Sequence, residues 1–155
     1  MSGPGLPAPS TRHTKAAAMT FAVNETAVQR ALSVLRIVSA FLLVQHGTAK
    51  LLGLPHVAYF DNLQLFSLFG FAGVLELVGG LLLLVGLFTR PVAFLLSGEL
   101  AFAYFIGHAT RGHFFAPMLN DGESAVLFCF VFLFLAAAGG GAWSVDATVR
   151  RRARA

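Results

Sequence analysis

The sequence predicts an all-α integral membrane protein, a four-helix bundle with both termini in the cytoplasm. Of its 155 residues, 57% are hydrophobic and 12% are charged, about half of the roughly 25% charge that a soluble domain carries. Four apolar stretches of about 20 residues each match the length that a helix needs to cross about 30 Å of hydrocarbon. Lysine and arginine gather beside these stretches, as they do at the cytoplasmic ends of transmembrane helices.

The chain divides into two tails and one membrane domain. Residues 1–29 contain three prolines and no long apolar run, so we expect a flexible cytoplasmic tail rather than a signal peptide. Residues 30–146 form the membrane domain, and residues 147–155 form a basic cytoplasmic tail. The expected spans cover about residues 34–53, 69–88, 91–110 and 123–142.

The apolar segments are predicted to be helices rather than strands. Transmembrane strands alternate apolar and polar residues over about 10 positions, whereas residues 81–84 and 128–138 are apolar without alternation. The second and third spans are joined only by residues 88–91. Pro91 suits the first turn of a helix, because the N–H that it lacks has no partner there. These two helices should therefore form a tight antiparallel hairpin.

The distribution of basic residues predicts the orientation. The segment before the first span, the hairpin at Arg90 and the C-terminal tail hold eight Lys or Arg, while the two long loops hold one, Arg111. Because cytoplasmic segments carry the excess of basic residues, the termini should lie inside and the long loops outside. The pI near 10 does not indicate nucleic-acid binding, since the basic residues flank apolar segments instead of forming a soluble basic face.

Four ionisable residues fall inside the expected spans, namely Arg36, Lys50, Glu76 and Glu99. Each costs at least about 2.5–3.5 kcal/mol near the centre of a bilayer unless it pairs, neutralises or lines a hydrated cavity. Two bases and two acids permit complete pairing, so we expect a buried salt-bridge network that links the first three helices. The alternative is that this network only fixes helix register and pairing.

Helical spacing supports that network. At about 100° per residue, Arg36, His46 and Lys50 share one polar stripe of the first helix. Gly73, Glu76 and Gly80 share one face of the second, where glycine lets a neighbouring backbone approach closely.

Further polar residues lie toward the outer ends of the helices and predict a cavity that opens outward. His46, His108, Asn120 and Glu123 are the members of this group. Asn120 and Glu123 also have the spacing of a capping box, a local helix-starting role. A haem held by His46 and His108 is the weaker alternative, because Glu99 and His108 are expected on opposite sides of the third helix. No tight set of His, Cys and carboxylate residues indicates a metal site.

Six short motifs occur in a fixed order along residues 30–146. They are HGTAKL at 46–51, GVLELVGG at 73–80, GLFTR at 86–90, GELAFAYF at 98–105, NDGE at 120–123 and GGGAWSVD at 139–146. In order and spacing they closely resemble the DoxX family of small four-helix membrane proteins. One departure is Asp121, where the family pattern has a second glycine, and this difference bears on the geometry of that turn.

The resemblance implies a protein of the bacterial inner membrane, surrounded by the lipid bilayer. With the four spans and the basic residues described above, it would be a multi-pass protein with both termini inside. Some relatives are linked to thiosulfate:quinone oxidoreductase and others to membrane oxidoreductase complexes. The motif residues that it carries over are His46, Lys50, Glu76, Arg90, Glu99, Asn120 and Glu123.

Together these observations lead to a hypothesis of a redox-associated membrane subunit that acts with a quinone or an oxidoreductase partner subunit. Lys50 or His46 would bind a quinone carbonyl, and Glu76 or Glu99 would exchange its proton. Arg36, His108, Asn120 and Glu123 are the expected substrate-binding residues. Two alternatives stay open, a small proton-coupled transporter or permeability factor, and a non-catalytic membrane scaffold.

Overall fold

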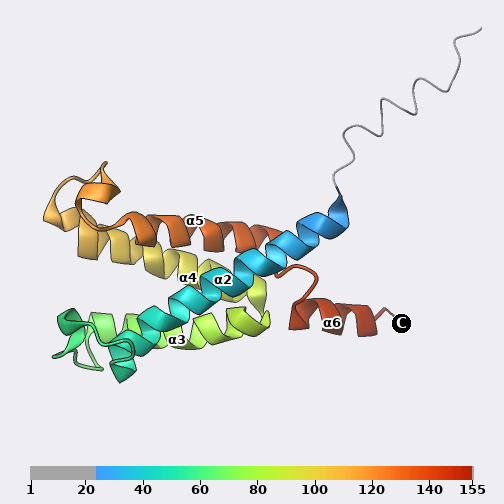
Figure 1. Cartoon of the computed structure of the whole chain (residues 1–155), viewed down its shortest axis with the longest axis horizontal. Helices are drawn as coiled ribbons and strands as arrows, with labels where there is room; N and C mark the ends of the chain where they lie inside the picture. The colour runs from blue at the N-terminus through green and yellow to red at the C-terminus, as the bar shows by residue number, and fades with distance from the viewer. Residues whose placement is uncertain (1–23, 155) are drawn as a thin grey trace, which may run out of the picture.

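The computed structural model describes residues 24–154, and these residues form helices and connecting loops without a strand. Four apolar helices form the bundle and a shorter helix follows them (Figure 1). The helices are α2 (Glu25–Leu52), α3 (Leu68–Val85), α4 (Thr89–Ala103), α5 (Glu123–Ala138) and α6 (Val145–Arg152). Short single turns are η1 (Ala58–Phe60), η2 (Tyr104–His108), η3 (Ala109–Arg111) and η4 (Pro117–Leu119). The all-α prediction is therefore confirmed for the described residues.

The helices pack mainly as two pairs, α2 with α3 and α4 with α5. Figure 1 shows the tight turn between α3 and α4, the beginning of α2 and helix α6 at one end of the bundle. The two long connections lie at the opposite end. This arrangement matches the expected hairpin and the expected separation of basic segments from long loops.

In the part of the chain that the structure describes, three helical segments are long and apolar enough to cross a membrane, Glu25–Leu52, Leu68–Val85 and Thr89–Arg111. The fourth expected span is shorter than predicted, because α5 ends at Ala138 before Gly139, whose φ of 92° lies in the left-handed region. With 16 residues, α5 covers about 24 Å, less than the hydrocarbon core of a typical bilayer.

The two expected tails are partly helical. Helix α2 begins at Glu25, well before residue 34, because Oδ1 of Asn24 accepts a hydrogen bond of 3.1 Å from the Ala27 N–H. Residues 1–23 of the predicted N-terminal tail lie outside the described residues, while residues 25–29 belong to the helix. At the other end, Ser144 caps α6 through the Ala147 N–H at 3.1 Å, so most of the basic C-terminal segment is helical.

Glycines bring α2 and α3 into close contact, as the sequence predicted. A Cβ atom on Gly47 would lie 2.6 Å from the backbone nitrogen of Leu77, and one on Gly80 would lie 2.8 Å from Cγ2 of Val44. At Gly73 the corresponding distance to Cβ of Lys50 is 3.0 Å. These contacts hold the Lys50 side chain against α3, one turn from Glu76.

Candidate functional site

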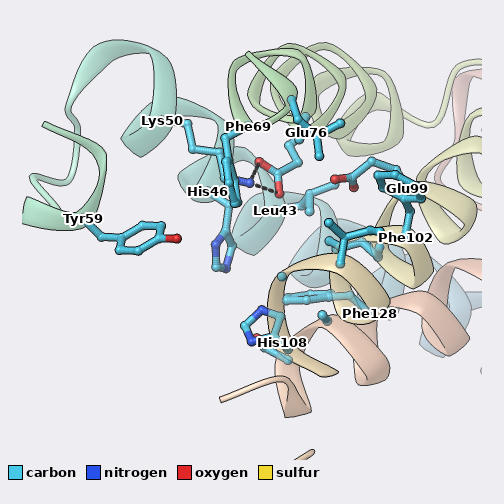
Figure 2. A pocket seen from close by; sticks show the side chains of 18 of the residues that line it. Leu43, His46, Lys50, Tyr59, Phe69, Glu76, Glu99, Phe102, His108 and Phe128 are labelled. Carbon is cyan, nitrogen blue, oxygen red and sulfur yellow. Dashed lines mark hydrogen bonds and ion pairs between the residues drawn. The ribbon is translucent and has the colours of Figure 1, made fainter. Parts of the chain in front are cut away.

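A cavity of about 400 Å³ lies between the two helix pairs, toward the end of the bundle that carries the long loops (Figure 2). All four bundle helices contribute to its wall. Its ionisable residues are His46, Lys50, Glu76, Glu99, His108, Arg111 and Asp121. Five of these are residues that the sequence predicted for the site, so the structure brings most of the expected group together.

The Lys50 ammonium group forms an ion pair with the Glu76 carboxylate at the base of the cavity. Nζ lies 2.7 Å from Oε1 and 2.6 Å from Oε2, so the contact uses both carboxylate oxygens. The two side chains are only 10% and 4% exposed. Because water is largely excluded, each charge depends on the other for its stabilisation.

Glu99 approaches this pair from α4. Figure 2 shows its carboxylate pointing toward Glu76 and Lys50. Within residues 24–154, its buried Oε2 has no hydrogen-bond partner. A buried polar atom of this kind is costly to leave unsatisfied, and because Glu99 lines the cavity, its carboxyl group is a candidate partner for a group that enters it.

Aromatic side chains form much of the remaining wall. Phe69, Phe102 and Phe128 surround the polar base, and the His46 ring meets the Phe128 ring edge-on at 6.2 Å between centroids (Figure 2). This combination of apolar walls with a few convergent polar groups is typical of small-molecule sites.

The long loops supply residues at the cavity that sequence reasoning did not assign to the site. Tyr59 comes from η1 and Arg111 from η3, and the Arg111 guanidinium lies 5.9 Å from the centroid of the Tyr59 ring. Asp121 also lines the cavity. Arg111 could have been singled out from the sequence, because it is the one Lys or Arg of the two long loops. No spacing pattern in the sequence indicated that Tyr59 would line the cavity.

A change of helix type brings His108 to the same cavity as Glu99. A spacing of nine residues at 100° each would place them on opposite sides of an α-helix. However, η2 is a π-helical turn, which contains about one residue more than a turn of α-helix. The side chains in and after this turn therefore point in other directions than the 100° spacing predicts. The expectation that these two residues face opposite ways was therefore wrong. The His108 ring is also held by a hydrogen bond of 3.0 Å between Nδ1 and the Asn120 carbonyl oxygen.

Arg36 does not join the ionic site, which corrects the expected pairing of two bases with two acids. Its fully buried guanidinium donates to the carbonyl oxygens of Leu83 and Leu84 at the end of α3, the latter at 2.7 Å. It also donates to those of Gly140 and Trp143, each at 2.9 Å. The last carbonyls of a helix have no intrahelical donor, and a buried guanidinium with five N–H groups satisfies several of them. Arg36 thus links α2 to the end of α3 and to the segment that follows α5, at the end of the bundle opposite the cavity.

Asn120 and Glu123 do not form the capping box that their spacing predicted. Helix α5 starts after Gly122, and Oδ1 of Asn120 accepts a hydrogen bond of 3.0 Å from the Gly122 N–H. The Asn120 amide donates to the carbonyls of Gly112 and His113, each at 3.3 Å, so it organises the loop. Neither residue lines the cavity, and Glu123 is exposed. Asp121 adopts a φ of 59°, the left-handed conformation that a glycine would take most easily.

The site can therefore accept a hydrogen bond at Glu99, donate one at Lys50 and hold an apolar ring between phenylalanines. Among residues 24–154, no group of three or more His, Cys, Asp or Glu side chains could hold a metal ion.

Known proteins resemble the chain in sequence. A family model described as DoxX matches residues 31–109. A protein of Haemophilus influenzae, titled only as uncharacterized, is 44% identical over 122 residues, which cover 74% of this chain and 87% of that protein. No solved structure matches the chain.

Proposed function

This chain belongs to the DoxX family of membrane proteins, and on that premise we propose that its cavity binds a quinone for an oxidoreductase partner. The observation that carries this proposal is the Glu99 carboxyl group, which lines an aromatic cavity beside the Lys50–Glu76 pair and whose buried Oε2 has no hydrogen-bond partner among the described residues. A cavity of about 400 Å³ falls in the range of ordinary ligand sites. A planar ring with two carbonyl oxygens fits such walls and such a polar base.

Each polar side chain has a distinct role in this proposal. Lys50 donates a hydrogen bond to one carbonyl oxygen of the ring, and Glu76 holds Lys50 in position. Glu99 accepts or delivers the proton that accompanies electron transfer. His46 contacts the ring edge or the second carbonyl. A quinone takes up two electrons and two protons on reduction, and in this proposal the electrons come from the partner oxidoreductase or from its substrate.

Binding of a short-chain ubiquinone analogue to the purified protein in nanodiscs tests this function. We expect saturable binding, and for the reduced quinol form we expect Glu99→Gln to weaken it about tenfold, because the charge-assisted hydrogen bond that a quinol hydroxyl donates to the Glu99 carboxylate is lost. Glu123→Gln is the matched control, since that carboxylate is exposed and outside the cavity. Absence of saturable binding, or an equal loss in both variants, would contradict the proposal.

We further propose that the protein lies in the bacterial inner membrane with its termini inside. The asymmetry of eight basic residues against one supports this orientation. The placement of α6 and the beginning of α2 at one end of the bundle agrees with it (Figure 1). The cavity then opens toward the outer side of the membrane.

A further inference from the structure

Helix α6 is fixed to the end of the bundle opposite the cavity. The Trp143 N–H donates to Oγ of Ser33 at 3.1 Å, and the Asp146 N–H donates to the Gly86 carbonyl at 3.0 Å. The Asp146 carboxylate in turn accepts from the N–H groups of Phe88 and Thr89 at 2.9 and 2.8 Å. Contacts to α2 and to the α3–α4 turn therefore place α6 in a defined position.

A groove of about 430 Å³ runs along one side of α6. Its apolar part comes from Val85, the last residue of α3, together with Trp143 and Val145. Its basic part comes from Arg151 and Arg152. An apolar floor at the end of a transmembrane helix thus continues directly into a pair of guanidinium groups.

The arginines of the C-terminal segment divide between two faces. At about 100° per residue, Val145, Thr148 and Arg152 fall on one side of α6, and Arg151 lies at the edge of that side. Arg150 and Arg154 fall on the opposite side and do not line the groove. Within residues 24–154, neither Arg151 nor Arg152 forms an ion pair with a carboxylate.

We propose that this groove binds an anionic phospholipid of the leaflet at this end of the bundle. The lipid phosphate lies against Arg151 and Arg152, and the glycerol region and the first acyl carbons lie against Val85 and Trp143. Tryptophan favours the boundary between hydrocarbon and headgroups, which places the groove at the right depth. Helix α6 is about 12 Å long, enough to pass through a headgroup layer of about 5–8 Å. Charge complementarity selects an anionic headgroup over a zwitterionic one.

Titration of the full-length protein with phosphatidylglycerol in a phosphatidylcholine background, followed by native mass spectrometry, tests the site. We expect specific binding of phosphatidylglycerol that Arg151→Gln/Arg152→Gln weakens by about tenfold or more. Arg150→Gln/Arg154→Gln removes the same charge from the other face and should leave binding within about twofold of the parent. Equal losses in both double variants would overturn the proposal in favour of general attraction by the basic segment.

Two competition experiments distinguish binding of a phospholipid from binding of other anions. Excess inorganic phosphate should not displace the lipid, because phosphate cannot use the apolar floor; displacement would overturn the assignment to a phospholipid. An acidic peptide that competes with the lipid for the parent, but not for the Arg151→Gln/Arg152→Gln variant, would also overturn it and identify a protein-docking groove. Unchanged circular dichroism of both variants excludes misfolding as the cause of a loss.

Discussion

Lys50 on α2 and Glu76 on α3 form a bidentate ion pair with Nζ–O distances of 2.6 and 2.7 Å, at a contact where glycines bring the two helices together. Gly47 and Gly73 lie on either side of the pair along the helix contact, so the same packing that joins the helices also excludes water from the charges. The pair therefore links the stability of α2 and α3 to the shape of the cavity above it.

Removing one partner of this pair should destabilise the protein more than removing both. Lys50→Met leaves the Glu76 charge buried, and we expect a loss of about 3–5 kcal/mol. The double variant Lys50→Met/Glu76→Met leaves no uncompensated charge and should recover part of that loss. Denaturant unfolding in detergent measures both. A double variant less stable than Lys50→Met would contradict this prediction, because it would show that the Glu76 side chain stabilises the protein even without Lys50.

The close contact of α2 and α3 should not tolerate a side chain at Gly47. A methyl group there would meet the Leu77 backbone at 2.6 Å, so Gly47→Ala should cost about 1–3 kcal/mol and weaken ligand binding by shifting Lys50. Gly98→Ala is the control, because a Cβ on Gly98 meets nothing within 4 Å. Thermal unfolding compares the two. Equal melting temperatures for both variants would argue against the close approach.

Arg36 should be essential for assembly rather than for ligand binding. Arg36→Met removes the guanidinium donor from the carbonyl oxygens of Leu83, Leu84, Gly140 and Trp143, so we expect a strong fall in melting temperature and abundance. Arg36→Lys should rescue only part of it, because an ammonium group cannot reach all four oxygens. Arg30→Met, at an exposed position of the same helix, should have little effect. Loss of quinone binding in a stable Arg36→Met protein would contradict this structural role.

Cysteine labelling should report the orientation. In a Cys129→Ser background, Phe115→Cys places a thiol at an exposed position of the second long loop, and Arg150→Cys places one on α6. An impermeant maleimide should label the first in intact spheroplasts and the second only after the membrane is opened. The reverse labelling pattern would show that the termini lie outside and the long loops inside, and would contradict the proposed orientation.

The parts of the fold that follow from hydropathy and charge were predictable. Lys50, Glu76 and Glu99 stood out because ionised groups are rare in apolar spans, and Gly73 and Gly80 marked the helix contact correctly. Arg36 was assigned to the wrong partners because charge matching ignores backbone carbonyls, which at a helix end are equally good acceptors.

Other features depend on geometry that the sequence does not display. The position of His108 depends on the π-helical turn η2, which no spacing rule predicted. Tyr59 and Asp121 reach the cavity from loops, where tertiary folding rather than periodicity sets the position. Asn120 has capping-box spacing, yet the helix starts two residues later than that motif requires.

Photoaffinity labelling with an azido-quinone, followed by peptide mapping, tests the central claim most directly. If the cavity binds the ring, tandem mass spectrometry of the labelled peptides should place the label on Phe102 and Phe128, and excess unlabelled quinone should suppress it. Label on the exposed Phe94 and Phe130 should be weak and insensitive to competition, since neither lines the cavity. Equal labelling of all four phenylalanines without competition would show that the quinone only dissolves in the surrounding lipid, and would contradict the proposed site.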